Sequence, residues 1–296
     1  MAANFWNSSQ NEQWMFDKSE LMRSRSEDLK IYTEEEYAKF MIFWANYIQA
    51  ICTEGSAVSN NCVKTRILVC QTATVYFKRF YTRRSFKDMD PFLVGATAIY
   101  LASKVDEMGP LSLTSLIKNV GHVLQKRWPM IAFDPSPSKN AAVYDGEFIL
   151  LEIMDCCLIV YHPHRPMNIY LQDLQKEHQL KEFDQLEAQC WKVANDTLRC
   201  DVCLLFPPHI IGIACIIVGA ELMNREKDIK TWLPELSVDF EKVGECVQMI
   251  FNMYKLWKAF DEREQIKALV SKLPKIAPGP NGPFFHQHYG PKISMY

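Results

Sequence analysis

Two cysteines with metal-ligand spacing are the first candidates for chemistry in this sequence. Cys200 and Cys203 have the CxxC spacing that zinc sites use, but no second pair accompanies them. Two pairs of histidines, each one residue apart, lie far from each other: His162 with His164, and His286 with His288. Neither pair has the further ligands that a metal ion needs. We therefore expect no metal site, and we interpret the two cysteines as a reduced structural pair.

Catalytic motifs are missing from the sequence. It contains no glycine-rich phosphate loop, no Gly-x-Ser-x-Gly nucleophile turn and no protein-kinase signature. We therefore expect no enzymatic activity and no cofactor, and we look for residues that bind a partner.

Two charged residues interrupt apolar patterns. Lys104 ends a helical stretch that is otherwise apolar, and Glu147 interrupts the row Val143, Leu150 and Met154. Burying a lone charge is very costly, so each residue must be paired or must reach the surface. The two side chains either form an intramolecular ion pair or contact a partner. The residues alone favour the ion pair.

Five further residues are candidates for partner binding. Asp106 and Glu107 follow near the end of the same helical stretch, where their charges oppose the helix macrodipole. They bind a basic partner or form a solvated helix end. Trp191, Asn195 and Asp196 share one face of another helical stretch. Tryptophan is enriched at binding hot spots, so these three form a recognition groove unless the tryptophan belongs to the core.

Helical periodicity runs through nearly the whole chain, and no segment alternates convincingly like a strand. Thr33 with Glu36 predicts a capping box. Asp90 before Pro91 predicts an N-cap followed by the first helical position. The predicted helices are 4–29 (interrupted near Ser8 and Ser9), 33–52, 67–80, 92–103, 112–128 (capped by Ser112), 141–158, 167–178, 183–198, 208–223, 237–260 (capped by Ser237) and 261–273. The predicted fold class is all-α.

Loop-forming residues divide these helices into groups. Small and polar residues predict a loop over 53–61, and the proline-flanked segment 162–166 predicts a domain boundary. The proline- and glycine-rich stretch 274–296 has little to bury, so we expect it to be disordered. The predicted division is an N-terminal helix over 1–32, a first domain over 33–162, a second over 163–273 and the tail 274–296.

The two predicted domains share one pattern. The segments 91–102 and 208–219 both begin with proline and carry glycine at the same offset, Gly95 in one and Gly212 in the other. A glycine inside a helix costs about 1 kcal/mol relative to alanine, and it is usually tolerated because another helix comes very close. The pattern indicates a duplicated bundle with a central helix in each copy, although two apolar core helices can resemble each other by coincidence.

Composition excludes several classes of protein. The 296 residues are 48% hydrophobic and carry a formal net charge of −2, which disfavours a general nucleic-acid binder. No signal peptide and no apolar stretch of membrane-spanning length are visible. The ten cysteines are irregularly spaced, so reduced core thiols in the cytosol or nucleus are expected.

Several separated motifs, in order along residues 4–274, closely resemble the cyclin family, and in particular the cyclin that serves the Mediator kinase module. They are Asn4–Trp6, Thr72–Tyr81, Tyr100–Glu107, Glu147–Leu158, Leu158–Pro163, Leu204–Pro208 and Trp257–Arg263. The resemblance implies two tandem five-helix cyclin folds preceded by an N-terminal helix. It also implies a regulatory subunit that activates a cyclin-dependent kinase of the Mediator complex and thereby regulates RNA polymerase II transcription.

The same resemblance assigns roles to residues. It implies that Lys104 and Glu147 face the mobile regulatory helix of the kinase, which reverses the preference for a purely internal ion pair. Phe5 and Trp6 lie in a segment with no core of its own, so they dock onto the cyclin folds or the kinase. The implied partners are the kinase and other subunits of the Mediator kinase module, in the nucleus, with no direct nucleic-acid or membrane contact.

The sequence departs from the cyclin pattern at two places, and one other class of protein is a possible alternative. The Met-Arg-Ala-Ile-Leu patch with which cell-cycle cyclins dock substrates is replaced here by 37–41, so such docking is not expected. The loop 53–61 is longer than the resemblance leads one to expect. The alternative class is a DNA-binding transcription factor with paired cyclin-like folds, as in the TFIIB type. The near-zero net charge and the lack of cysteine before Cys52 disfavour it.

Overall fold

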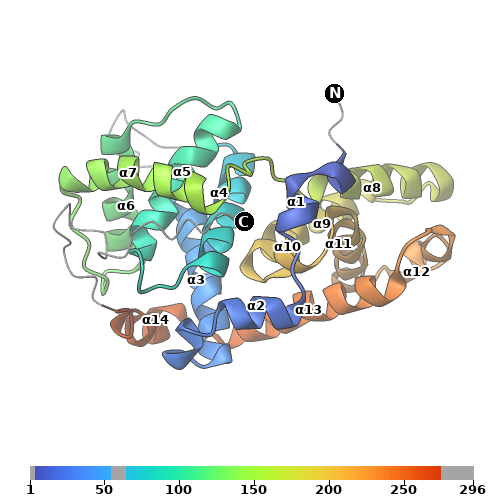
Figure 1. Cartoon of the computed structure of the whole chain (residues 1–296). Helices are drawn as coiled ribbons and strands as arrows, with labels where there is room; N and C mark the ends of the chain where they lie inside the picture. Colours follow the sequence, from blue (N-terminus) through green and yellow to red (C-terminus); the bar gives the residue numbers. More distant parts are fainter. Residues whose placement is uncertain (1–3, 55–64, 275–296) are drawn as a thin grey trace. The chain divides into compact units, whose positions relative to one another are not determined.

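The computed structural model describes residues 4–54 and 65–274, and all regular elements in these ranges are helical (Figure 1). The predicted all-α class is therefore confirmed. Most of the predicted loop 53–61 and almost all of the predicted tail 274–296 lie outside the described residues. By their contacts, the residues form two compact units. Among the described residues, the first unit comprises Leu21–Phe40, Asn46–Leu158 and 262–274, and the second comprises 4–20, Met41–Ala45 and Ile159–Asp261.

The first unit is built on five long helices. They are α3 (Glu34–Thr53), α4 (Ile67–Arg83), α5 (Pro91–Val105), α6 (Leu113–Arg127) and α7 (Ser138–Ile153). The predicted capping box of Thr33 and Glu36 and the predicted N-caps Asp90 and Ser112 are all present. Helix α5 is buried from Pro91 to Ser103 and packs against α4, α6 and α7, so it is the central helix of this unit.

The second unit repeats this arrangement around α11 (Pro208–Leu222), which packs against α8 (His164–His178), α9 (Phe183–Asp196), α12 (Glu226–Ile229) and α13 (Phe240–Ala259). The close approach predicted at the two glycines is confirmed. A Cβ atom on Gly95 would lie 2.8 Å from the ring of Tyr47, and one on Gly212 would lie 3.1 Å from the backbone nitrogen of Met167. Both central helices therefore need glycine because a neighbouring helix occupies the space of a side chain.

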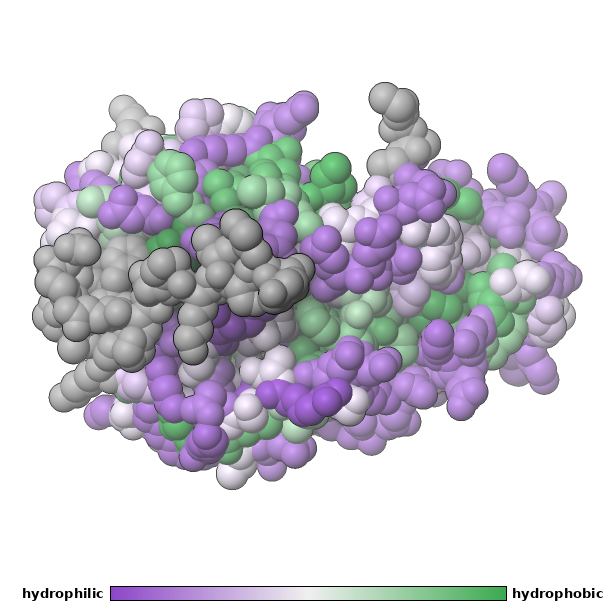
Figure 2. Space-filling view, viewed as in Figure 1, coloured by the Kyte–Doolittle hydropathy of each residue, from purple (hydrophilic) through white to green (hydrophobic). Residues whose placement is uncertain are grey.

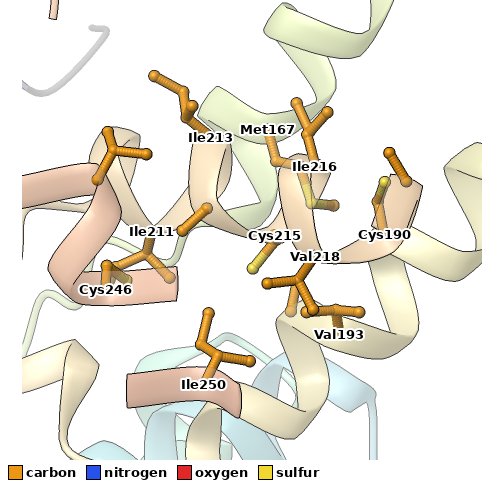
Figure 3. Packing of buried hydrophobic residues seen from close by; sticks show 14 of the residues in the cluster. Met167, Cys190, Val193, Ile211, Ile213, Cys215, Ile216, Val218, Cys246 and Ile250 are labelled. Carbon is orange, nitrogen blue, oxygen red and sulfur yellow. The ribbon is translucent and has the colours of Figure 1, made fainter. Parts of the chain in front are cut away.

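Thiols contribute to the core of the second unit. Cys190, Cys215 and Cys246 lie among isoleucine and valine side chains that point toward one another (Figure 3). Burial raises the pKa of the Cys190 thiol to about 12, so the thiolate is scarce at neutral pH. Every cysteine in the described ranges is a free thiol. The buried thiols of Cys190, Cys215 and Cys246 act as small apolar side chains rather than as reactive groups.

The N-terminal segment is not one helix. It forms a 3-10 turn (η1, Phe5–Asn7), α1 (Ser9–Gln13), α2 (Lys18–Ser24) and a second turn (η2, Asp28–Lys30). The predicted break near Ser8 is present because the Ser8 hydroxyl caps α1. The next break follows from tertiary contact, since the Phe16 amide donates to the Leu204 carbonyl instead of continuing a helix.

Two other predicted helix limits were wrong. Helix α7 ends at Ile153 rather than at Leu158, because Asp155 and Cys156 adopt the left-handed conformation with φ of 50° and 53°. Helix α13 is capped by Asp239, whose carboxylate accepts from the Lys242 amide, and not by Ser237. The remaining short elements are η3 (Thr197–Arg199), α10 (Val202–Leu205), η4 (Leu233–Glu235) and α14 (Glu262–Ser271).

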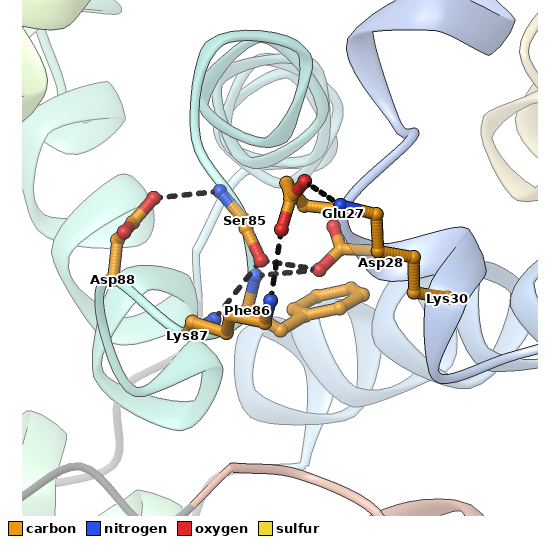
Figure 4. Close-up of polar contacts among 7 residues, drawn as sticks. All are labelled: Glu27, Asp28, Lys30, Ser85, Phe86, Lys87 and Asp88. Carbon is orange, nitrogen blue, oxygen red and sulfur yellow. Dashed lines mark hydrogen bonds and ion pairs between the residues drawn. The ribbon is translucent and has the colours of Figure 1, made fainter.

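A buried carboxylate ties the segment before α3 to the loop between α4 and α5 (Figure 4). The Asp28 carboxylate accepts from the Ser85 hydroxyl at 2.6 Å and from the Phe86 amide at 3.0 Å. Glu27 beside it pairs with Lys30 and, at 2.9 Å, with Lys87. Burial raises the pKa of Asp28, although the two hydrogen bonds oppose this effect.

Asp28→Ala is expected to lower the free energy of unfolding by about 2 kcal/mol, because it leaves the Ser85 and Phe86 donors without their buried acceptor. Asp28→Asn keeps an acceptor oxygen and should cost less. A raised folded-state pKa means that the aspartate stabilises the fold below its unfolded pKa and loses this contribution as pH rises. Urea unfolding just above pH 3.8 should therefore show a weaker pH dependence in Asp28→Asn. Equal stability of the alanine variant and wild type would contradict this role.

Candidate functional site

Lys104 and Glu147 meet where α5 and α7 pack together. The Lys104 ammonium lies 2.8 Å from each Glu147 carboxylate oxygen. The Glu147 side chain is 9% exposed, whereas the Lys104 side chain is 35% exposed. The carboxylate thus lies inside and the ammonium faces outward. The structure confirms that each charge has a partner, and it shows the intramolecular pair that the residues alone favoured.

An aromatic ring completes this pair. The Lys104 ammonium lies 4.1 Å from the centre of the Tyr100 ring, one turn earlier on α5. Burial by itself lowers the pKa of Lys104, but the hydrogen bond to Glu147 and the contact with Tyr100 outweigh it and leave the pKa raised. Lys104 therefore stays charged across the physiological range, with its head group held in one place.

Two exposed aromatic side chains that were not among the predicted site residues flank Glu147. Tyr144 is 49% exposed and Phe148 is 59% exposed, and their rings pack edge to face at 5.6 Å. Figure 2 shows hydrophobic surface on the part of the first unit that carries α5 and α7. Tyr144 and Phe148 are four residues apart, which places their side chains on one face of a helix. This spacing was the signal in the sequence that could have indicated a shared aromatic surface. The α5–α7 surface, defined as Lys104, Glu147, Tyr144 and Phe148, combines apolar area with an oriented charge.

Phe148→Asp is expected to weaken binding of a partner at the α5–α7 surface by roughly 30-fold, which is the loss of about 2 kcal/mol typical of an aromatic hot spot. Folding should be nearly unchanged because the ring is already exposed. Ile67→Asp, at an exposed apolar position at the start of α4, is the matched control and should bind normally. Titration by calorimetry measures both variants, and equal affinities would exclude Phe148 from the binding surface.

Asp106 and Glu107 differ in where they point. Asp106 is the C-cap residue of α5, is half-buried and hydrogen-bonds to the Thr72 side chain, while burial raises its pKa. Glu107 is exposed and adopts a left-handed conformation with φ of 52°. Of these two predicted partner-binding residues, only Glu107 presents its charge to solvent.

Phe5 and Trp6 are attached to the second unit. The Phe5 ring contacts the Tyr161 ring at 5.7 Å, and the Trp6 ring lies 5.4 Å from His209. Gln10 binds this segment further, because its side-chain amide accepts from the Tyr161 amide and donates to the Tyr161 carbonyl. Trp6 nevertheless stays 56% exposed, so one face of this ring is available to a partner.

Trp191 and Asn195 lie together on α9, as their spacing predicted. Trp191 is half-buried and its ring lies 4.7 Å from the ring of His164. The His164 Nε2 atom is 3.1 Å from the Asn195 side-chain oxygen. Burial lowers the pKa of His164, although the contact with Asn195 opposes this, so the ring is neutral near pH 7. Trp191 packs partly against the core and keeps part of its surface exposed.

Asp196 follows on the same helix and is engaged inside the unit. Its carboxylate accepts from the Arg199 guanidinium at 2.8 Å and from the Tyr254 hydroxyl at 2.9 Å. Arg199 in turn stacks on the Trp257 ring at 4.1 Å. These contacts hold the carboxylate in place beside Trp191 and Asn195.

The described ranges contain neither a cluster of metal ligands nor a helix suited to cross a membrane. No group of three histidine, cysteine, aspartate or glutamate side chains is placed to hold a metal ion there. Cys200 and Cys203 are both half-buried thiols, and His286 and His288 lie outside the described residues. None of the helices in these ranges is both long and apolar enough to cross a membrane.

Comparisons with known proteins agree with this architecture. Residues 60–133 match the cyclin N-terminal domain, and residues 162–276 match the cyclin C-terminal domain. The chain is 52% identical to cyclin-C of Caenorhabditis elegans, with 97% of this chain and 98% of the relative covered. It is 45% identical to cyclin-C of Rattus norvegicus (95% and 94% covered) and 43% identical to cyclin-C of Drosophila melanogaster (95% and 99% covered).

Solved structures show the same fold. A chain of the yeast TFIIK complex aligns with a TM-score of 0.63 at 24% identity, covering 83% of this chain and all of that chain. A chain of the CAK complex from Chaetomium thermophilum aligns with a TM-score of 0.66 at 20% identity, covering 91% of this chain and 87% of that chain. With two cyclin domains built around α5 and α11, the chain belongs to the cyclin family. Within that family its similarity is to cyclin C, as the sequence motifs predicted.

Membership of this family defines the class of function. A cyclin is a regulatory subunit that activates a cyclin-dependent kinase and is not itself an enzyme, in agreement with the prediction from the sequence. The segment 37–41, which we expected in place of the substrate-docking patch of cell-cycle cyclins, is largely buried, since Tyr37, Phe40 and Met41 are core residues. The alternative class, a DNA-binding factor with paired cyclin-like folds, has no support from the relatives named above.

Proposed function

We propose that this chain binds and activates the cyclin-dependent kinase of the Mediator complex, and that it thereby regulates RNA polymerase II transcription in the nucleus. The observation that carries the proposal is the α5–α7 surface in a chain whose relatives are cyclin-C proteins. An exposed aromatic pair beside an oriented ammonium group is suited to hold a partner helix in one position.

The proposed mechanism is positional. Tyr144 and Phe148 supply apolar contact area, and the partly exposed Lys104 ammonium can share an oxygen atom of the kinase while Glu147 holds it. In protein kinases a mobile helix must be placed so that its glutamate pairs with the catalytic lysine. A cyclin that binds this helix stabilises the active arrangement, and no chemistry is required of the cyclin itself.

The second unit offers further contacts within this proposal. We assign the exposed face of Trp6, with Phe5 behind it, to the kinase, and the Trp191–Asn195–Asp196 face of α9 to another subunit of the Mediator kinase module. The half-buried tryptophan beside fixed amide and carboxylate groups supports the second assignment. Glu107 is available to a basic group of either partner because it is exposed.

Affinity capture from native nuclear extract tests this proposal. The tagged chain should recover a Mediator-type kinase together with further kinase-module subunits, identified by mass spectrometry. Trp191→Ala should retain the kinase and lose another subunit, whereas Phe148→Asp should lose the kinase. Recovery of a cell-cycle kinase instead, with no Mediator subunit, would overturn the assignment to Mediator.

A further inference from the structure

One loop of the first unit carries a motif that the proposed function does not use. Of the 15 prolines in the chain, only Pro137 directly follows a serine or threonine, and the sequence there is Ser136-Pro137-Ser138-Lys139. We propose that Ser136 is phosphorylated by a proline-directed serine/threonine kinase, and that the phosphate then caps the N-terminus of α7.

The residues around Ser136 suit such a kinase. A residue before proline is restricted to extended conformations, and proline has no amide hydrogen that a substrate groove would have to satisfy. A kinase that binds its substrate in an extended form therefore finds Ser136 already in a suitable conformation. Lys139, three places after the serine, supplies the positive charge that kinases of the cyclin-dependent class select at that position.

The local structure makes the segment accessible. Residues 132–136 have no regular secondary structure, and Asp134, Pro135, Pro137 and Ser138 are exposed. Ser136 is partly exposed, and its hydroxyl lies 2.8 Å from the Ser138 hydroxyl, a contact at the surface that water can replace.

The first turn of α7 is weakly held, which lets the segment open for a kinase. Its N-cap is Pro137, which makes no side-chain capping bond, and the first turn contains no acidic residue. The helix start is closed by the Lys139 amide donating to the Ser136 carbonyl at 3.1 Å and the Asn140 amide donating to the Pro137 carbonyl at 3.1 Å. Amides at a helix start without a side-chain partner are readily exposed to water, so the turn can unwind at little cost.

The modification itself is an ordinary phosphoryl transfer. The Ser136 hydroxyl oxygen attacks the γ-phosphorus of ATP, and the new oxygen–phosphorus bond forms as the bond to the bridging β–γ oxygen breaks. ADP leaves with that oxygen, and the serine proton passes to the catalytic aspartate of the modifying kinase. ATP is the only co-reactant.

The product supplies what the helix start lacks. A phosphoserine carries roughly −1.5 to −2 charges near pH 7 and three acceptor oxygens. Next to the first turn of α7 it meets the positive end of the helix macrodipole. The Lys139 ammonium, which lies 3.5 Å from the centre of the Phe133 ring in the unmodified chain, belongs to the same turn and is a further positive charge for the phosphate. Phosphorylation should therefore stabilise the start of the helix that also carries Glu147 and Phe148, although the inference itself does not rest on the proposed function.

The test uses the full chain, ATP and an active cell-cycle cyclin-dependent kinase complex as the modifying enzyme. Intact mass spectrometry should show the gain of one phosphate group, located at Ser136 by fragmentation. Ser136→Ala should abolish the gain and Ser138→Ala should retain it. Lys139→Ala should lower kcat/KM for the reaction about tenfold or more. The phosphorylated chain should melt at a higher temperature than the unmodified chain, and this difference should shrink in high salt.

Each half of the proposal has its own contrary result. No incorporation into a folded wild-type chain, or incorporation that persists in Ser136→Ala, would overturn the modification site. Incorporation at Ser136 with an unchanged or lowered melting temperature would overturn the capping of α7. Circular dichroism of the Ser136→Ala variant establishes that it is folded, so that loss of phosphorylation reports the site and not the fold.

Discussion

Lys104→Glu is expected to remove most of the gain in kinase activity that this chain confers. The substitution replaces an oriented ammonium by a carboxylate beside Glu147, so the partner meets repulsion where it met a donor. Disrupting a desolvated, hydrogen-bonded charge at an interface costs about 2–5 kcal/mol, which is roughly 30-fold or more in affinity. The rate of phosphorylation by the kinase is measured at increasing concentrations of this chain. The concentration that gives half of the maximal rate should be at least that many times higher for Lys104→Glu than for wild type.

The exchanged pair distinguishes a partner contact from an internal ion pair. Lys104→Glu combined with Glu147→Lys restores opposite charges between α5 and α7 but presents a carboxylate outward. If the kinase contacts Lys104, the double variant should fold well and still activate the kinase poorly. If the pair only stabilises this unit, the double variant recovers activation along with stability, and the assignment of Lys104 to the kinase contact is then wrong.

Gly212→Val is expected to destabilise the second unit by about 3 kcal/mol. A Cβ atom there would lie 3.1–3.3 Å from the backbone and Cβ atoms of Met167. Backbone cannot move aside as the end of a flexible side chain can, so α8 and α11 would have to separate. Chemical unfolding followed by circular dichroism measures the change, and a variant as stable as wild type would show that α8 and α11 do not pack this closely.

Gly244 offers the matched control because it also lies inside a helix of the same unit. A Cβ atom on Gly244 would meet nothing within 4 Å, so packing within the unit does not require a glycine at this position of α13. Gly244→Ala should raise the free energy of unfolding by about 1 kcal/mol, the difference in helix propensity. Gly212→Val should lower the free energy of unfolding and Gly244→Ala should raise it. This difference in sign is expected only if Gly212 is needed because α8 packs closely against α11.

Features set by neighbours in the sequence were predictable. The capping box of Thr33 and Glu36 and the N-caps Asp90 and Ser112 need only a few adjacent residues, and each is present. The central helices were also predictable, because a glycine in an apolar helix has few explanations other than close packing.

Features set by distant residues, by unusual backbone conformations or by a choice between two equally good caps were not predictable. The N-terminal segment breaks at Phe16 because its amide donates to the Leu204 carbonyl, a partner that periodicity does not reveal. Helix α7 ends before its predicted limit because Asp155 and Cys156 adopt a left-handed conformation. This conformation is usually found at glycine, so two non-glycine residues gave no signal for it in the sequence. Ser237 and Asp239 are equally good caps by type, and in the structure the Asp239 carboxylate accepts from the Lys242 amide.

The candidate site also contains features that the sequence predicted and features that it did not predict. That Lys104 and Glu147 each need a partner or an exposed position followed from the cost of burying a charge, and the structure shows that the two residues pair with each other. The exposure of Tyr144 and Phe148 did not follow, because aromatic residues in a helix are usually assigned to the core. Only the packed unit shows that this face of α7 is uncovered by the residues that the structure describes.

The proposed function is that this chain activates a Mediator-type cyclin-dependent kinase without any catalysis of its own. The most direct measurement is the phosphorylation rate of a peptide from the RNA polymerase II C-terminal domain, by the purified kinase, with and without this chain. We expect no phosphorylation by the chain alone and a large, saturable gain when the chain is added to the kinase. Phe148→Asp should shift this gain to higher concentration, and Ile67→Asp should not. A kinase that binds the chain but gains no activity would contradict this proposed function.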